Sequence, residues 1–182
     1  MRYHGVVYIG ISLKLRNPVD RFISSYLYTR NKHNNNYKIE QLIYDQNPFV
    51  SVSNPITRLL AWNIFQEKNN ISNKKLEDWI NFGWDNEFKI GSYPINDEIF
   101  KEANKNLDTI YLIGTTENFD LFLESFSKKY GIHNSKIKYH SKNQNKNPEE
   151  LNQIKNSFIE KIKEINSYDI DIYERVKKQL NK

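Results

Sequence analysis

The chain has 182 residues and a mass of 21.8 kDa, which predicts one domain, residues 1–182, that can bury a core of its own. The sequence has no cysteine, which excludes disulfides and thiolate metal sites, and its four histidines have no ligand spacing, so no metal is expected. No apolar run approaches about 18 residues, so no membrane span is expected. The net charge of +5 favours anionic partners.

The first predicted elements are a strand over residues 6–15 and a helix that follows it directly. Val, Ile and Leu dominate the strand segment. Asn17 has the residue type of an N-cap and Pro18 that of a first helical residue, so the helix is expected to run from Pro18 to about His33.

Arg16 therefore lies where a buried strand ends and a helix begins. Unpaired backbone N–H groups and the helix dipole favour an anion at such a place. Ser24 comes seven residues after Asn17, so both lie on one helix face. Arginine presents a fork of donors that suits a phosphate, and a serine hydroxyl can donate one more hydrogen bond. The segment predicts a phosphate-binding strand–turn–helix in which side chains hold much of the ligand.

The remaining predicted elements are mostly helices, with one further strand. In chain order they are a helix at 39–44, a helix with Asn54 as N-cap that runs to about Gln66, a helix after Ser72, a helix near 97–106, a strand at 109–115, a helix at 117–130 that stops at Gly131, and two charged helices after Pro148. Helical spacing predicts one buried face on the helix after Asn54, formed by Ile56, Leu59, Leu60 and Ile64.

This order predicts an α/β chain with a parallel sheet covered by helices. We expect Leu13 and Ile113 to lie on neighbouring or next-neighbouring parallel strands. Arg16 and Thr115 would then face one cleft at the carboxyl edge of the sheet, where ligands of open α/β sheets bind.

Four segments together resemble a known family. Arg16-x-Pro-x-x-Arg-x-x-Ser-x-Tyr after an apolar strand resembles the 3′-phosphate-binding segment of sulfotransferases that use 3′-phosphoadenosine 5′-phosphosulfate (PAPS) as donor. The other three are similar in order and spacing to segments of carbohydrate and heparan-sulfate 2-O-type members. They are Asn54-x-x-Thr-Arg-x-Leu, Gly114-Thr-Thr-Glu between a strand and a helix, and Asn166-x-x-Asp-x-x-x-Tyr.

The resemblance implies a P-loop-like fold and a set of site residues. It implies that Arg16 and Ser24 hold the 3′-phosphate of PAPS, and that Lys138 and Lys142, in a lysine-rich stretch, contact phosphate as that stretch folds over the nucleotide. His4 lies in a His-Gly pair similar to one that precedes the 3′-phosphate segment in 2-O-type members, which makes it the candidate general base. The spacing is shorter here, and the alternative is an ordinary N-terminal histidine.

In the family, a P-loop-like strand–turn–helix with a lysine holds the 5′-phosphosulfate, upstream of the 3′-phosphate segment. Only fifteen residues precede Arg16 here, whereas a βαβ unit needs about thirty. The chain is therefore expected to lack the N-terminal βαβ part and to match the C-terminal, helix-rich portion of a full domain. Its location would be cytoplasmic if the chain is complete, or the Golgi lumen if a signal anchor precedes it.

The expected function is transfer of a sulfuryl group from PAPS to a hydroxyl of a carbohydrate acceptor, with little or no activity of this chain alone. One alternative is a non-catalytic module that binds adenosine 3′,5′-bisphosphate or another anion. The other is a basic nucleic-acid-binding domain. The sequence carries no RNA-binding signature and its net charge is modest, so nucleic acid is not an expected partner.

Overall fold

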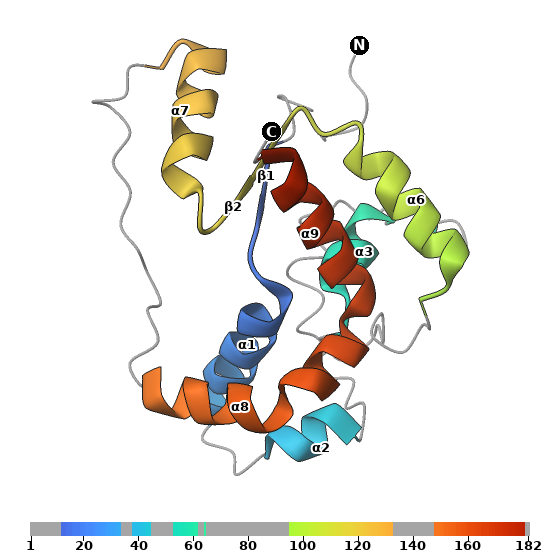
Figure 1. The fold of residues 1–182 in the computed structure, drawn as a ribbon, viewed down its shortest axis with the longest axis vertical. Coiled ribbons are helices and arrows are strands. Elements are labelled where there is room, and N and C mark those ends of the chain that lie inside the picture. The colour runs from blue at the N-terminus through green and yellow to red at the C-terminus, as the bar shows by residue number, and fades with distance from the viewer. Residues whose placement is uncertain are drawn as a thin grey trace.

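The computed structural model describes residues 12–33, 38–44, 53–61, 64, 95–132 and 148–180 (Figure 1). The elements are β1 (Ser12–Leu15), α1 (Pro18–His33), α2 (Ile39–Tyr44), α3 (Pro55–Leu60), α6 (Asp97–Leu107), β2 (Leu112–Thr115), α7 (Phe119–Tyr130), α8 (Pro148–Ile165) and α9 (Ser167–Leu180). The described part is therefore α/β and rich in helix. The predicted helix after Ser72 and residues 6–11 of the first predicted strand lie outside the described residues.

The two strands form a small parallel sheet. Leu13 is the register partner of Ile113, and Leu15 is the partner of Thr115. The prediction that Leu13 and Ile113 lie on neighbouring parallel strands is confirmed. The Thr116 N–H donates to the Leu15 carbonyl at 2.7 Å, which extends the pairing beyond β2. Because the strands run in the same direction, the residues that follow them meet at one carboxyl edge.

Helices cover both faces of the sheet, which is the usual arrangement for parallel strands. On one face, a Cβ added at Gly114 would lie 2.5 Å from the Phe122 ring, so glycine allows α7 to approach β2 closely. On the same face the ammonium of Lys14 lies 4.4 Å from the centre of the Phe119 ring. Leu13, Leu15 and Ile113 pack against α3, α6 and α9 on the other face, and Figure 1 shows α7 and these three helices on opposite sides of the strands.

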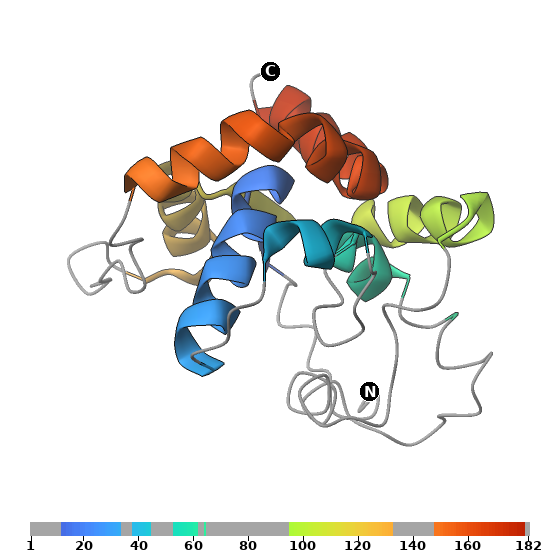
Figure 2. The ribbon, with the colours of Figure 1, turned by 90° about the horizontal axis from the view of Figure 1, so that it is seen from below.

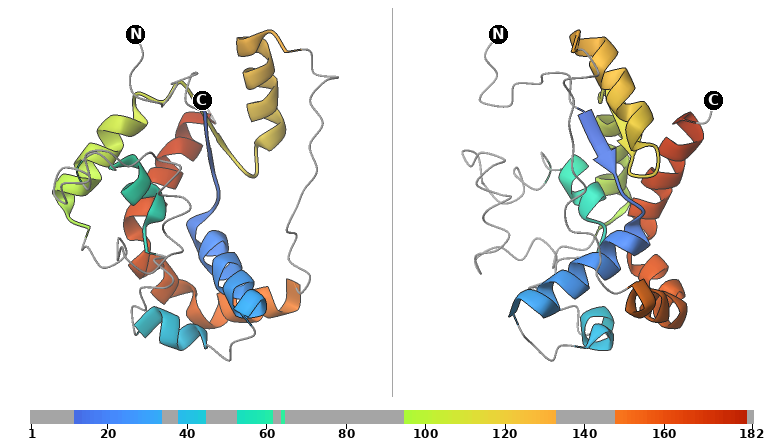
Figure 3. Two further views of the ribbon diagram at one scale, coloured as in Figure 1. Left: turned by 180° about the vertical axis from the view of Figure 1, so that it is seen from behind. Right: turned by 90° about the vertical axis from the view of Figure 1, so that its left-hand side faces the viewer.

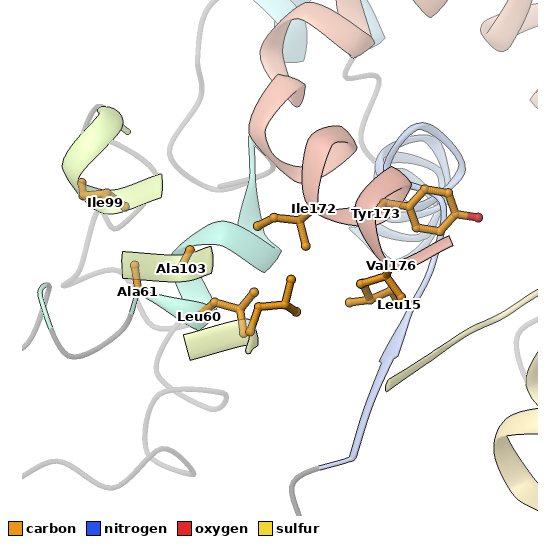
Figure 4. Packing of buried hydrophobic residues seen from close by; sticks show 9 residues of the cluster. Leu15, Leu60, Ala61, Ile99, Ala103, Ile172, Tyr173 and Val176 are labelled. Atoms are coloured by element: carbon orange, nitrogen blue, oxygen red, sulfur yellow. The ribbon is translucent and has the colours of Figure 1, made fainter. Parts of the chain in front are cut away.

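The core on the second face is formed by apolar side chains of β1, α3, α6 and α9 (Figure 4). Leu15, Ile172 and Val176 are each at most 1% exposed, and burial of such a side chain contributes roughly 1.5–3 kcal/mol. The predicted burial of Leu59 is wrong, because its side chain is 46% exposed. Leu60 is buried as predicted, Ile56 and Ile64 are partly buried against the same core, and Thr57 and Ala61 also face inward. α3 ends at Leu60, and residues 62–63 and 65–66 of the predicted helix lie outside the described residues.

A second apolar cluster joins α1, α2 and α8. Phe22, Ile23 and Ile162 are each at most 1% exposed and lie at its centre. Ion pairs between Asp20 and Lys155 (2.9 Å) and between Arg30 and Glu150 (2.6 Å) connect α1 to α8 at its surface. Figure 2 shows α8 and α9 as one layer above α1, α2 and α3.

Two helix boundaries lie where their capping residues indicate. The Asn17 side-chain oxygen accepts hydrogen bonds from the N–H groups of Val19 (3.0 Å) and Asp20 (3.3 Å), as expected for an N-cap. Gly131 ends α7 with φ of 64°, a left-handed conformation that glycine adopts without strain. None of the helices in the described ranges is long and apolar enough to cross a membrane.

Candidate functional site

The candidate site begins at the junction of β1 and α1. Arg16 lies between the two elements and is exposed, and no carboxylate of the described residues forms an ion pair with it. The right-hand view of Figure 3 shows β1 leading directly into α1. Ser24 is half-buried on α1, seven residues after Asn17, which corresponds to about 10 Å along the helix axis. Arg16 therefore precedes the first residue of α1, and Ser24 lies about two turns into the helix.

The backbone donors expected to favour an anion at this helix start are largely occupied. Pro18 has no N–H, and the N–H groups of Val19 and Asp20 donate to the Asn17 side chain. The N–H of Arg21 donates to the Asn17 carbonyl at 2.9 Å, as in a regular helix. An anion at this position would therefore depend on side chains and the helix dipole rather than on backbone amides.

Arg21 adds a second positive charge close to Arg16. Its guanidinium donates to the Asn166 side-chain oxygen at 3.3 Å. Burial lowers the pKa of Arg21 to about 10, the charge of Asp169 opposes this shift, and repulsion from Arg16 adds to it. The contact with Asn166 and the attraction to Asp169 give Arg21 a structural role between α1 and the start of α9. An anion beside Arg16 would reduce the repulsion between the two arginines.

Residues after β2 form the other side of the edge. Leu15 and Thr115 share a register position, but Thr115 is only 1% exposed, so the expectation that its side chain faces a cleft is wrong. The exposed residues there are Thr116, whose hydroxyl donates to the Leu15 carbonyl at 3.1 Å, and Glu117. Thr116 and Glu117 follow β2 at the same edge at which Arg16 follows β1, because the two strands pair in parallel.

Glu117 is connected to α9 through Tyr173. The tyrosine hydroxyl donates a hydrogen bond to the Glu117 carboxylate. Burial raises the pKa of Tyr173 above its usual range, and this hydrogen bond and the charges of Glu117, Glu174 and Asp20 raise it further. Figure 4 shows the Tyr173 ring at the edge of the apolar cluster, with its hydroxyl pointing away from the other labelled side chains.

A buried polar cluster lies beneath this edge and joins α3 to α9. One oxygen of the Asp169 carboxylate accepts from the N–H and the hydroxyl of Thr57, both at 2.7 Å, and the other accepts from the Ile56 N–H at 3.0 Å. Burial raises the pKa of Asp169, while these hydrogen bonds and the charge of Arg21 oppose the shift. Asp169 thus satisfies the first-turn donors of α3.

Asn54 has a different role from the predicted one. It occupies the N-cap position of α3 in a left-handed conformation with φ of 51°, but its side chain does not cap that helix. Its amide instead donates to the Ile165 carbonyl at 2.9 Å, and its side-chain oxygen accepts from the Asp169 N–H at 2.9 Å. Its own N–H donates to the Asn166 side chain at 3.1 Å.

Arg58 completes the cluster. It is 6% exposed and donates from Nε to the Ser53 carbonyl at 2.9 Å. Burial lowers the pKa of Arg58 to about 10, and the charge of Asp169 opposes this. The two quoted segments that begin at Asn54 and Asn166 therefore meet in space. The sequence contained this signal as two separate motifs, without an indication that they contact each other.

Three of the predicted site residues cannot be placed. His4, Lys138 and Lys142 lie outside the described residues. Of the predicted residues, the structure places Arg16 at the sheet edge and Ser24 on α1. Arg21, Glu117 and Tyr173 also lie near this edge, and sequence reasoning did not assign them to the site.

Comparisons with known proteins give no further guide to the function. Family models, curated proteins and solved structures contain no match to this chain.

Proposed function

We propose that the chain binds adenosine 3′,5′-bisphosphate, as the nucleotide part of PAPS, at the carboxyl edge of its sheet, and that it takes part in sulfuryl transfer to a carbohydrate hydroxyl. The observation that carries the proposal is Arg16, an exposed arginine without a carboxylate partner among the described residues, between a parallel strand and a long helix. Open α/β sheets bind ligands at this edge. A P-loop-like arrangement of the sheet belongs to the same proposal.

In this proposal, Arg16 and Ser24 hold the 3′-phosphate. The guanidinium of Arg16 would donate a pair of hydrogen bonds to two phosphate oxygens, and the Ser24 hydroxyl would donate one more. The positive end of the α1 dipole and the nearby charge of Arg21 favour the same anion. Because Asn17 occupies the first backbone donors, these side chains would supply the directional contacts.

The chemistry is displacement at sulfur. The acceptor hydroxyl oxygen bonds to the sulfur of PAPS as the bond between sulfur and the phosphate oxygen breaks, the hydroxyl proton passes to a base, and adenosine 3′,5′-bisphosphate leaves. The 3′-phosphate is remote from the reacting sulfur. Arg16 and Ser24 would therefore contribute binding and orientation of the donor rather than direct stabilisation of the charge that develops at the sulfur.

The test is a calorimetric titration of the purified chain with adenosine 3′,5′-bisphosphate and with AMP, which lacks the 3′-phosphate. We expect binding of the bisphosphate only. Hydrogen bonds to a charged group contribute roughly 1.5–3 kcal/mol each, so Arg16→Ala should weaken binding by at least about tenfold. The matched control is Arg30→Ala, which removes an arginine from the far end of α1. Equal affinity for the two nucleotides would exclude the 3′-phosphate assignment.

A further inference from the structure

Two exposed residues of opposite charge follow the paired ends of β1 and β2. Arg16 directly follows Leu15, and Glu117 follows Thr115 by two residues. Leu15 and Thr115 are register partners, and paired strands lie about 4.8 Å apart. Both charged residues are exposed, yet no ion pair joins them in the part of the chain that the structure describes. A ligand at this edge would therefore meet a cation and an anion together.

Glu117 differs from the other carboxylates around Tyr173. Asp20 forms an ion pair with Lys155 at 2.9 Å, and Glu174 forms one with Lys177 at 3.5 Å. Glu117 accepts from the neutral Tyr173 hydroxyl and has no cationic partner among the described residues. A carboxylate can accept about four hydrogen bonds, so the hydroxyl leaves most of this capacity available to a ligand. The bond to Tyr173, on a helix packed in the core, holds the carboxylate at the sheet edge.

We propose that Glu117 accepts a hydrogen bond from a hydroxyl adjacent to the phosphate that Arg16 binds, and that this hydroxyl is the ribose 2′-OH beside the 3′-phosphate. The inference rests on the proposed function. A carboxylate repels a phosphate that faces it, but it attracts a hydroxyl donor on the neighbouring carbon of the same ligand. Carboxylates that follow strands of parallel sheets hold ribose hydroxyls in this way in dinucleotide-binding folds. Glu117 would make the site selective for ribonucleotides.

Tyr173 is a positioning residue in this proposal, because it acts through Glu117 and not on the ligand. Its removal should reduce the preference for the 2′-hydroxyl without removing 3′-phosphate binding. Tyr173→Phe deletes the hydroxyl and keeps the buried ring, so the apolar cluster that contains the ring is retained.

The experiment compares the Kd of adenosine 3′,5′-bisphosphate with that of its 2′-deoxy analogue. The wild-type chain should bind the ribonucleotide at least about tenfold more tightly, as expected for a hydrogen bond to a charged group. Glu117→Ala should reduce this ratio to about one, and Glu117→Gln and Tyr173→Phe should give intermediate ratios. The matched control is Glu124→Gln on α7, a carboxylate paired with Lys128 at 3.0 Å, which should leave the ratio unchanged.

The outcomes separate this inference from the proposed function. If the wild-type chain binds both nucleotides equally, the role of Glu117 is wrong while the 3′-phosphate site stands. If it binds neither, both proposals fail. If Glu117→Ala lowers the Kd of both nucleotides by the same factor, the carboxylate only repels the phosphate, and the inference is overturned. Glu117 is exposed, so its variants should keep the wild-type circular dichroism spectrum.

Discussion

Replacing Asp169 with alanine should strongly destabilise the protein, because this buried carboxylate joins α9 to the first turn of α3. The change leaves the Ile56 N–H and the N–H and hydroxyl of Thr57 without their acceptor. A buried donor without a partner costs about 1–3 kcal/mol, and the buried guanidinium groups of Arg21 and Arg58 also lose the attraction of this charge. We expect the free energy of unfolding to fall by about 3–5 kcal/mol, which lowers Tm by about 6–20 °C in a chain of this size.

Urea denaturation followed by circular dichroism measures this loss. Asp171→Ala is the matched control, because Asp171 is an exposed aspartate on the same helix, and it should change stability by less than about 0.5 kcal/mol. Asp169→Asn keeps the shape of the side chain and one acceptor oxygen, so its loss should be intermediate. If Asp169→Ala and Asp171→Ala destabilise the chain equally, the buried polar cluster does not hold α3 against α9, and the reasoning is refuted.

Two further predictions concern the sheet and its edge. Gly114→Ala should lower the free energy of unfolding by about 1–3 kcal/mol, because the added Cβ would lie 2.5 Å from the Phe122 ring. The double variant with Phe122→Ala should lose less than the sum of the two single losses, and strictly additive losses in denaturation experiments would contradict the contact. Arg16→Ala should change stability by less than about 0.5 kcal/mol, since Arg16 is exposed, whereas Arg21→Ala should cost at least about 2 kcal/mol because Asn166 and Asp169 lose a donor and a charge. If the two variants lose comparable stability in melting experiments, the assignment of Arg16 to binding and of Arg21 to structure is wrong.

Local signals predicted most of the elements that the structure describes. Asn17 and Pro18 define the start of α1, and Gly131 defines the end of α7, because cap positions depend on the conformations that single residues prefer. The parallel neighbours Leu13 and Ile113 followed from the alternation of strands and helices. The position of Arg16 at the carboxyl edge followed from the same alternation.

Contacts between segments far apart in the sequence could not be predicted from these local signals. Helical spacing could not exclude Leu59 from the buried face of α3, because the inward face is selected by Thr57, which bonds to Asp169 from the other end of the chain. Asn54 has the residue type of an N-cap, yet its left-handed backbone directs its amide to Ile165. The hydrogen bond between Glu117 and Tyr173 likewise depends on how α9 packs on the sheet, which no local pattern encodes.

The most direct test of the proposed site is phosphorus NMR of adenosine 3′,5′-bisphosphate titrated with the chain, because the two phosphates give separate resonances. The account predicts that wild-type protein shifts or broadens the 3′-phosphate resonance more than the 5′-phosphate resonance. This difference should disappear with Arg16→Ala and remain with Arg30→Ala, whose arginine lies at the far end of α1. A response confined to the 5′-phosphate, or one that Arg16→Ala leaves unchanged, would contradict the assignment of this edge as a 3′-phosphate site.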